Sequence, residues 1–243
     1  MSAAYTGLSG WFEYLNQDCD YEKWSQYLHK RLKEAGTAPG GRGLDIGCGS
    51  GYFTRYFQNS GYDMTGFDVS PEMLAQAEAR KGGAAKPQYV LADVRKLKIN
   101  GRADFAVAVN DCFNYVPPKD IPAALRRVAA ALKKGGAFLF DVSSEYKLRE
   151  IVGNNTFCED REEVAYMWFN RLYPDRVEMD VTVFSRRGDG LFSRADEHHV
   201  QYIHSEAFLR EELEKAGFLC LKTEGALGSA EDGTRVNFIA KRV

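Results

Sequence analysis

Residues 44–51 read Leu44-Asp45-Ile46-Gly47-Cys48-Gly49-Ser50-Gly51, so a short apolar run ends in an acid and three glycines then alternate. A helical pattern begins directly afterwards, at Tyr52. Alternating glycines allow a sharp backbone turn and leave room for a ligand against the main chain. The first amide N–H groups of the following helix point toward such a ligand. The stretch therefore predicts a strand, a ligand-binding loop and a helix.

A second acid follows in register with this loop. Asp68 ends the next apolar run, at the place where nucleotide-binding folds use an acid to hold a pair of ribose hydroxyls, about 20 residues on. The dinucleotide fingerprint requires Gly or Ala where this chain has Tyr52, and a pyrophosphate would be repelled by Asp45. A nicotinamide oxidoreductase is therefore the less favoured reading of the loop.

Strands and helices alternate along residues 43–141, which predicts a doubly wound, mostly parallel sheet with helices on both faces. The expected strands are 43–46, 63–68, 89–92, 105–109 and 137–141, and the expected helices are 50–60, 70–80 and 120–132. Ligands of such sheets lie beyond the carboxyl ends of the strands. Four successive strands end in polar residues that would line one rim: Asp45, Asp68, Asp93 and Asn110-Asp111.

The flanking segments divide the chain into three parts. Residues 1–38 are expected to be helical, with a helix over 20–35, and to form an N-terminal segment or lid. Residues 146–205 break the rhythm with β-type runs at 164–169, 176–185 and 198–204, and predict an inserted antiparallel β lid. The α/β pattern then resumes with a helix at 205–216 and strands at 218–223 and 235–241, so the ligand-binding domain comprises 39–145 and 206–243. The aromatic residues of the insertion either wall a substrate pocket or pack it onto the core: Tyr166, Trp168, Phe169, Tyr173 and Tyr202.

Composition narrows the function classes. The chain of 243 residues has 32 basic and 34 acidic side chains, which argues against a broad nucleic-acid footprint without excluding a local basic patch. No apolar stretch approaches the roughly 18 residues of a membrane span, and no secretion signal is recognised. Five scattered cysteines predict no disulfide framework and a cytoplasmic location. Adjacent His198 and His199 would point to opposite faces of a strand, so no metal site is expected.

The pattern D-x-G-x-G-x-G at 45–51 resembles motif I of the class I S-adenosylmethionine-dependent methyltransferases, and the resemblance covers about residues 20–145 and 205–243. It implies a Rossmann-like sheet of seven strands whose last strand is antiparallel. Residues 132–136 are similar to the family's turn before the fifth strand, except that Lys134 replaces the usual proline. Residues 21–24 and 113–115 further resemble small bacterial methyltransferases of unassigned substrate.

The resemblance also implies which residues bind S-adenosyl-L-methionine, whose product is S-adenosyl-L-homocysteine. Asp68 would bind both ribose hydroxyls, Val69 and Met73 would pack on the adenine, and Asp93 beside Val94 would accept the adenine amino group. The glycine loop and Asn110 would approach the methionine moiety, and N-terminal aromatics would close the pocket. The expected cofactor-binding residues are Tyr14, Tyr21, Trp24, Asp45, Gly47, Cys48, Gly49, Gly51, Asp68, Val69, Met73, Asp93, Val94 and Asn110.

The expected reaction is an in-line displacement that moves a methyl group to nitrogen or oxygen of a small-molecule acceptor. A general base is optional, and Asp111, Tyr115 and His199 are its candidates. The sequence Asn110-Asp111-Cys112-Phe113 lacks the two prolines of the enzymes that methylate amino groups of nucleic acids. A tRNA or protein methyltransferase and a non-catalytic nucleotide-cofactor-binding protein remain alternatives. The sequence leaves the acceptor open, and a monomer and a homodimer are both compatible with it.

Overall fold

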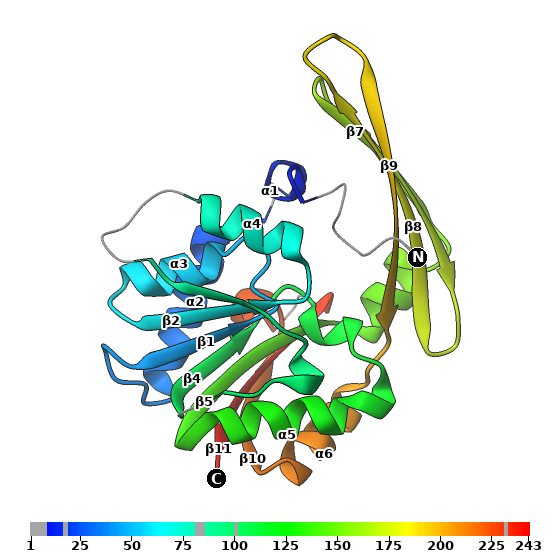
Figure 1. Cartoon of the computed structure of the whole chain (residues 1–243). Helices are drawn as coiled ribbons and strands as arrows, with labels where there is room; N and C mark the ends of the chain where they lie inside the picture. The colour runs from blue at the N-terminus through cyan, green and yellow to red at the C-terminus, as the bar shows by residue number, and fades with distance from the viewer. Residues whose placement is uncertain (1–8, 17–18, 81–85, 100–101, 231–232) are drawn as a thin grey trace.

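Seven strands form the central sheet of the computed structural model, which describes residues 9–16, 19–80, 86–99, 102–230 and 233–243 (Figure 1). Their order across the sheet is β10-β11-β5-β4-β1-β2-β3. Only β11 runs antiparallel to its neighbours, β5 and β10. The predicted fold class is therefore confirmed. The strand bounds are β1 (Arg42–Ile46), β2 (Asp63–Asp68), β3 (Gln88–Leu91), β4 (Ala103–Ala108), β5 (Leu132–Ser143), β10 (Phe218–Glu224) and β11 (Arg235–Arg242).

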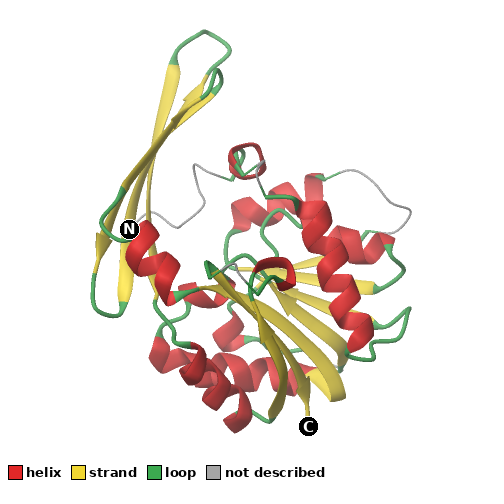
Figure 2. Ribbon diagram, turned by 180° about the vertical axis from the view of Figure 1, so that it is seen from behind, coloured by secondary structure: helices red, strands yellow, loops and turns green. Residues whose placement is uncertain are grey.

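Helices cover both faces of this sheet (Figure 2). Because successive residues of a strand point to opposite faces, Phe105 and Ala106 of β4 enter two separate cores. The Phe105 core packs against α2 and α3, and the Ala106 core packs against α5 and α6. The α-helix bounds are α1 (Phe12–Leu15), α2 (Tyr21–Glu34), α3 (Tyr52–Asn59), α4 (Pro71–Ala79), α5 (Ile121–Ala131) and α6 (Glu206–Lys215).

The expected helix starts are confirmed by their capping hydrogen bonds. The side chains of Asp20, Ser70 and Ser205 accept hydrogen bonds from the backbone N–H groups three residues on, at the starts of α2, α4 and α6. Short helical turns connect the strands at the rim. Their bounds are η1 (Val94–Lys96), η2 (Cys112–Tyr115), η3 (Pro118–Asp120), η4 (Lys147–Val152) and η5 (Ala226–Gly228).

The start of β5 differs from the prediction. The sequence predicts a turn over 132–136 and a strand from 137, but β5 already begins at Leu132. Ala103 pairs with Leu132 and Phe105 with Ala137, so the register shifts between these pairs and the residues from Lys133 to Gly136 form a bulge within the strand.

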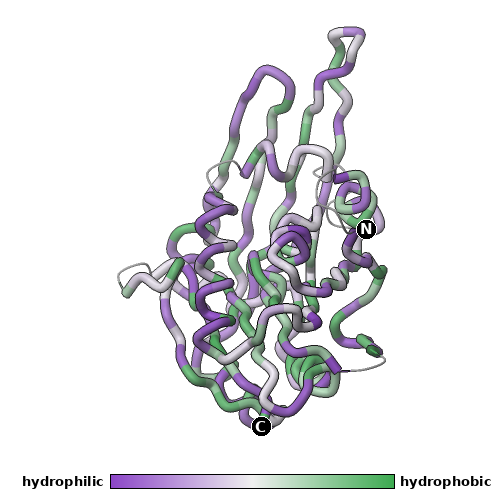
Figure 3. The backbone as a smooth tube through the Cα atoms, turned by 90° about the vertical axis from the view of Figure 1, so that its left-hand side faces the viewer, coloured by the Kyte–Doolittle hydropathy of each residue, from purple (hydrophilic) through white to green (hydrophobic). Residues whose placement is uncertain are grey.

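A second sheet of four antiparallel strands rises from the rim of the first (Figure 1). Hydrophilic and hydrophobic stretches are mixed along its long hairpins (Figure 3). The first two predicted runs lie in β7 and β8, and the third, 198–204, overlaps the end of β9, which begins earlier and stops at Tyr202. The sequence did not predict β6 or η4, because β6 is a short edge strand with a partly polar sequence. The bounds are β6 (Thr156–Asp160), β7 (Val164–Leu172), β8 (Arg176–Arg186) and β9 (Phe192–Tyr202).

Candidate functional site

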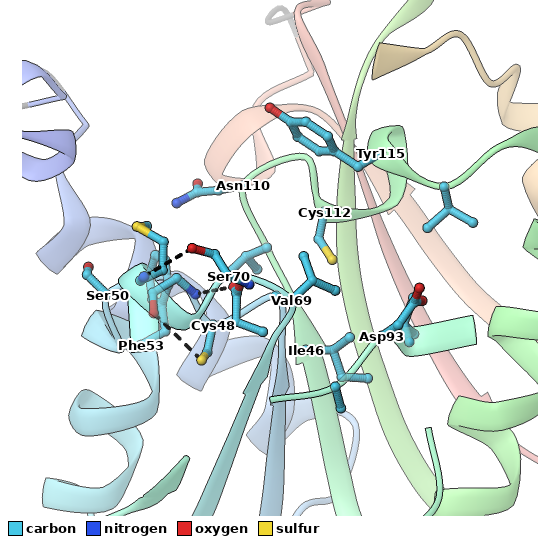
Figure 4. Close-up of a pocket in the computed structure, with 18 of the residues that line it drawn as sticks. Ile46, Cys48, Ser50, Phe53, Val69, Ser70, Asp93, Asn110, Cys112 and Tyr115 are labelled. Atoms are coloured by element: carbon cyan, nitrogen blue, oxygen red, sulfur yellow. Dashed lines mark hydrogen bonds between the residues drawn. The ribbon is translucent and has the colours of Figure 1, made fainter. Parts of the chain in front are cut away.

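A cavity of about 260 Å³ lies beyond the carboxyl ends of β1, β2 and β4, where the sequence predicts the ligand (Figure 4). It receives side chains from the glycine loop, α4, η1, η2 and the start of α2. Ten of the fourteen predicted cofactor-binding residues line it: Tyr21, Gly47, Cys48, Gly49, Asp68, Val69, Met73, Asp93, Val94 and Asn110. The other four, Tyr14, Trp24, Asp45 and Gly51, are not among the lining residues.

The glycine loop needs its glycines for two different reasons. Gly49 has a φ of +52°, and a Cβ added there would lie 3.1 Å from Cε of Met73 on the cavity wall. Gly51 instead faces the protein, because its added Cβ would lie 2.4 Å from the Tyr89 hydroxyl and 2.9 Å from Cβ of Ala77. Gly49 therefore keeps the cavity open, whereas Gly51 allows α3 and β3 to pack closely.

Asp68 forms the polar wall of the cavity at the end of β2. Its Oδ2 accepts a hydrogen bond from the Gly49 amide at 2.8 Å, and its Oδ1 accepts one from the Ser70 amide at 2.9 Å. Burial raises the pKa of Asp68, and these amides oppose that shift. Each oxygen keeps capacity for a further hydrogen bond, so the carboxylate is oriented and can still accept from a ligand.

Asp93 is held by an arginine that sequence reasoning missed. The guanidinium of Arg95, two residues on, binds its carboxylate, with Nε 2.9 Å from both oxygens, and reaches Asp120 at 3.2 Å. Hydrogen bonds from Arg95 lower the pKa of Asp93. Asp93 is therefore ionised at neutral pH, and both of its oxygens already accept from Arg95. No sequence motif indicates Arg95 as the partner of Asp93, because a basic residue after a strand-end acid is common on protein surfaces.

Asp45 lies beneath the glycine loop, where it is 1% exposed. Its Oδ2 accepts a hydrogen bond from the Thr54 hydroxyl at 2.5 Å. Burial raises the pKa of Asp45 to about 7, although the Thr54 bond opposes this shift. The acid of the motif therefore supports the loop from below and does not contact the cavity.

The N-terminal aromatics divide between the cavity and the surrounding packing. Tyr21 lines the cavity, and its ring lies 4.8 Å from that of Tyr52, measured between centroids. Trp24 instead packs under the Arg235 guanidinium at 5.4 Å, and Tyr14 packs on Trp11 at 5.8 Å. Among the three predicted closing residues, only Tyr21 reaches the cavity.

The loop after β4 takes an unusual backbone conformation. Asn110 and Asp111 have φ values of +60° and +63°, which non-glycine residues rarely adopt. The buried carboxylate of Asp141 compensates for this, because it accepts hydrogen bonds from the amides of both residues, at 2.8 and 3.4 Å. Arg235 in turn pairs with Asp141. The arrangement directs Asn110 to the cavity.

Asp111 is a poor candidate for the general base. Its carboxylate lies 2.8 Å from a guanidinium nitrogen of Arg235 and 3.8 Å from the Lys147 ammonium. Although burial raises the pKa of Asp111, these two cations lower it below its ordinary value. The residue does not line the cavity. It therefore belongs to a structural ion-pair cluster.

The other two base candidates lie side by side, although 84 residues separate them in the sequence. Tyr115 of η2 lines the cavity, and its hydroxyl lies 3.1 Å from Nδ1 of His199 on β9. Nε2 of His199 lies 2.8 Å from Oε2 of Glu197. Sequence reasoning missed Glu197, although a Glu and a His two residues apart on one face of a strand was a usable signal.

The inserted aromatics do not line this cavity. Tyr166 and Trp168 pack instead with Trp11 and Leu15 of the N-terminal segment, on the sheet's apolar face. For Tyr166 and Trp168 these contacts favour packing, the second of the two alternatives, over a place in the wall of this cavity. Cys112 does line the cavity, but burial raises the pKa of its thiol, so it is not a ready nucleophile.

The cavity walls fit S-adenosylmethionine by their chemistry. One wall carries the oriented Asp68 carboxylate, for which no ion pair is found in the described part of the chain. Ile46, Met73 and Val94 add apolar surface. A cation with an apolar purine and two ribose hydroxyls matches such walls, whereas a pyrophosphate would be repelled by Asp68. Within the described ranges no set of three or more metal-ligating side chains is grouped, and no helix has the length and apolarity of a membrane span.

Comparisons with known proteins agree with this geometry. A family model described as a methyltransferase domain matches residues 44–136. A protein of Geobacillus sp. (strain WCH70) that is named as a methyltransferase is 29% identical, with 98% of this chain and 99% of the relative covered. The crystal structure of an S-adenosylmethionine-dependent methyltransferase from Clostridium acetobutylicum is 28% identical with a TM-score of 0.85, and 96% of each chain is covered.

A more distant structure shares the fold. The S-adenosylmethionine-bound amino pentose methyltransferase CalS10 from Micromonospora echinaspora superimposes with a TM-score of 0.78 over 100% of both chains, at 18% identity. Fold, cavity and relatives agree on one conclusion. They support a class I S-adenosylmethionine-dependent methyltransferase, an enzyme that uses S-adenosylmethionine as its methyl donor.

Proposed function

We propose that this methyltransferase modifies a hydroxyl or amino group of a small molecule, which binds beside η2 at the foot of the second sheet. The observation that carries the proposal is that η2 contacts both the cofactor cavity and the second sheet. Its Tyr115 lines the cofactor cavity, while Asn114 donates to the carbonyl of Tyr202 on β9 at 3.0 Å and accepts from the Ser143 amide at 2.9 Å. An acceptor at η2 would contact the cofactor cavity and the second sheet at once.

The cofactor would be held by the residues that the resemblance names and the cavity contains. Asp68 would bind the ribose hydroxyls, and Met73 and Val94 would flank the adenine. Gly49 and Asn110 would approach the methionine moiety. Asn110 has a positive φ, and with this backbone conformation it lines the cavity. When bound, the cofactor supplies an activated methyl group, so the protein has to align the acceptor and exclude water.

The opposite side of the cavity is closed by aromatic and charged contacts. Tyr21 packs against Tyr52, and Glu13 of α1 bonds to Ser50 in the glycine loop and to Arg80 after α4. An acceptor would therefore approach from the η2 side. We also propose that residues 1–38 and 146–205 act as lids, the first over the cofactor and the second at the acceptor.

Two observations favour a small acceptor over a nucleic acid or a protein. The net charge of −2 gives no broad attraction to a polyanion. The solved amino pentose methyltransferase has the same fold, so this scaffold can serve an acceptor of sugar size. Hydroxyl and amine acceptors of that size are the first to test.

The test uses methyl-labelled S-adenosylmethionine with three acceptor pools: dialysed small molecules of a bacterial extract, bulk tRNA and bulk protein. We expect label in the small-molecule pool, and Asp68→Asn should abolish its incorporation while Asp63→Asn, at the exposed start of β2, should not. Label found only in tRNA or protein would overturn the small-molecule assignment. Mass spectrometry of the labelled product would identify the methylated atom.

A further inference from the structure

The inward face of β9 carries two ionisable residues where a half-buried strand normally carries apolar ones. Glu197 and His199 are 3% and 4% exposed, whereas Asp196 and His198 on the other face reach solvent. Burying a carboxylate is unfavourable unless the group is paired and hydrogen-bonded. Such departures from the strand pattern are expected at functional sites rather than in a packed core.

The hydrogen bonds of His199 define where its proton lies. A carboxylate can only accept a hydrogen bond, so with Glu197 as the carboxylate Nε2 of His199 carries the hydrogen in the 2.8 Å contact with Oε2. Nδ1 of the neutral ring is then an acceptor, and the hydroxyl of Tyr115 donates to it across 3.1 Å. Tyr115 also lines the cavity, so its side chain connects His199 to the place where an acceptor would bind.

We propose that Tyr115, His199 and Glu197 form a proton relay that takes up the proton of the acceptor as it is methylated. The acceptor oxygen or nitrogen forms its bond to the methyl carbon while the carbon–sulfur bond breaks and its electron pair stays on sulfur. The acceptor proton passes to the Tyr115 oxygen, and the Tyr115 proton passes to Nδ1 of His199. The resulting imidazolium is stabilised by the Glu197 carboxylate.

The relay defines the acceptor class and rests on the proposed function, because it needs an acceptor at η2. It serves a hydroxyl or an amine that still carries a proton to lose. A carboxylate or a tertiary amine has no such proton and would leave the relay without a role. Tyr115 is the catalytic residue in this scheme, and His199 and Glu197 are positioning residues that act through it.

Several groups face His199 from the elements around it. Tyr115 of η2 and Glu197 of its own strand both bond to its ring. The neighbouring strand β8 places Met179 opposite His199 and Val181 opposite Glu197. Asp111, which directly precedes η2, is already paired with Arg235 and Lys147. Glu197 bonds directly to the ring, so its carboxylate would stabilise a proton on His199.

The first experiment needs no acceptor. The protein is labelled with ¹⁵N-histidine and bound to S-adenosylhomocysteine, and the ring nitrogens of His199 are assigned at pH 7 by comparison with His199→Gln. We expect a neutral ring with its hydrogen on Nε2. A hydrogen on Nδ1, or a doubly protonated ring, would overturn the proposal, because neither form can accept the proton of Tyr115.

The second experiment measures methyl transfer to the acceptor found in the small-molecule pool. We expect Tyr115→Phe, His199→Gln and Glu197→Gln to lower kcat by about 100-fold or more, with little change in KM for His199→Gln and Glu197→Gln. The deficit should shrink as pH rises, because the acceptor then loses its proton to solvent. A merely structural role would leave a deficit that is independent of pH.

The matched control is His198→Gln, which changes the same residue type on the same strand. His198 lies on the opposite face and bonds to Asp180 at 2.7 Å, so its variant should keep wild-type turnover. Wild-type turnover in His199→Gln would overturn the relay, whereas transfer by the wild type to macromolecules alone would overturn the proposed function. The ¹⁵N measurement tests the relay without any measurement of turnover.

Discussion

The backbone amide of Gly49 donates a hydrogen bond of 2.8 Å to the carboxylate of Asp68, 19 residues later in the chain. β1 and β2 are adjacent parallel strands, so the loop after one and the acid after the other meet at the same rim. The bond joins the two sequence motifs into one cavity wall. It also means that Asp68 orients the glycine loop in addition to facing the ligand.

Replacement of Asp68 by Ala should weaken binding of S-adenosylhomocysteine by at least about tenfold. The variant removes an ionised acceptor for the ribose hydroxyls, and a hydrogen bond to a charged group contributes roughly 1.5–3 kcal/mol. It also leaves the Gly49 and Ser70 amides without their acceptor. Calorimetry measures the dissociation constant, with Asp63→Ala at the exposed start of β2 as the control. An unchanged constant would remove Asp68 from the binding site.

Gly49→Val should abolish cofactor binding while most of the fold persists. The residue has a φ of +52°, which costs a β-branched side chain about 1–2 kcal/mol, and its Cβ would press on Met73 at the cavity wall. Circular dichroism and calorimetry are measured on the same samples. The control is Gly188→Ala, since no heavy atom lies within 4 Å of an added Cβ there. Normal binding by Gly49→Val would show that this part of the loop does not face the cofactor.

The sequence predicts the sheet and its ligand rim well because both depend on local patterns. Apolar runs that end in acids identified β1 and β2, and capping residues such as Ser70 identified helix starts. The position of most cavity residues follows from these elements. A few neighbouring residues determine where a strand ends and how the following loop turns, so a short stretch of sequence is sufficient to predict both.

Contacts between residues far apart in the chain could not be predicted from the sequence. Tyr115 and His199 were both candidates, but only the fold brings η2 against β9 and joins them to Glu197. The same is true of Arg235, which reaches Asp111 across 124 residues. Such contacts depend on how two elements pack, and no local spacing reports that.

The stability of the cofactor-free protein should fall between about pH 4 and pH 7 because of Asp45. Burial raises its pKa to about 7, whereas the unfolded chain has an ordinary value near 3.8. The native state therefore binds more protons in this window, and the free energy of unfolding decreases with rising pH. The loss is on the order of 4 kcal/mol, and it is complete above pH 7.

Asp45→Asn should make this slope shallower, since the amide cannot ionise and still accepts from Thr54, whereas Asp68, whose pKa burial also raises, keeps its own contribution. Urea unfolding at several pH values between 4 and 8 measures the slope for the wild type and the variant. Asp63→Asn, at the exposed end of β2, is the control and should keep the wild-type slope. A slope in Asp45→Asn that equals the wild-type slope would assign the dependence to another group.

Arg235→Met should destabilise the protein by about 3–5 kcal/mol at pH 7, because it leaves buried carboxylates without their cation. Arg235 pairs with both Asp111 and Asp141, and Asp141 in turn holds the amides of Asn110 and Asp111. Cofactor affinity should therefore fall as well, since Asn110 lines the cavity. Urea unfolding and calorimetry measure the two effects.

The pH dependence separates this ion-pair cluster from simple packing. The folded pKa of Asp111 is lowered, so its pairing stabilises the protein above the ordinary carboxyl pKa and is lost as pH falls through the folded value. The deficit of Arg235→Met should accordingly shrink as pH falls toward 4, where the orphaned carboxylates take up protons. Arg194→Met, which breaks an exposed pair with Asp196, should cost at most about 1 kcal/mol at any pH. A deficit of Arg235→Met that stays constant from pH 7 to pH 4 would mean that the guanidinium acts through its contact with Trp24, not through its charge.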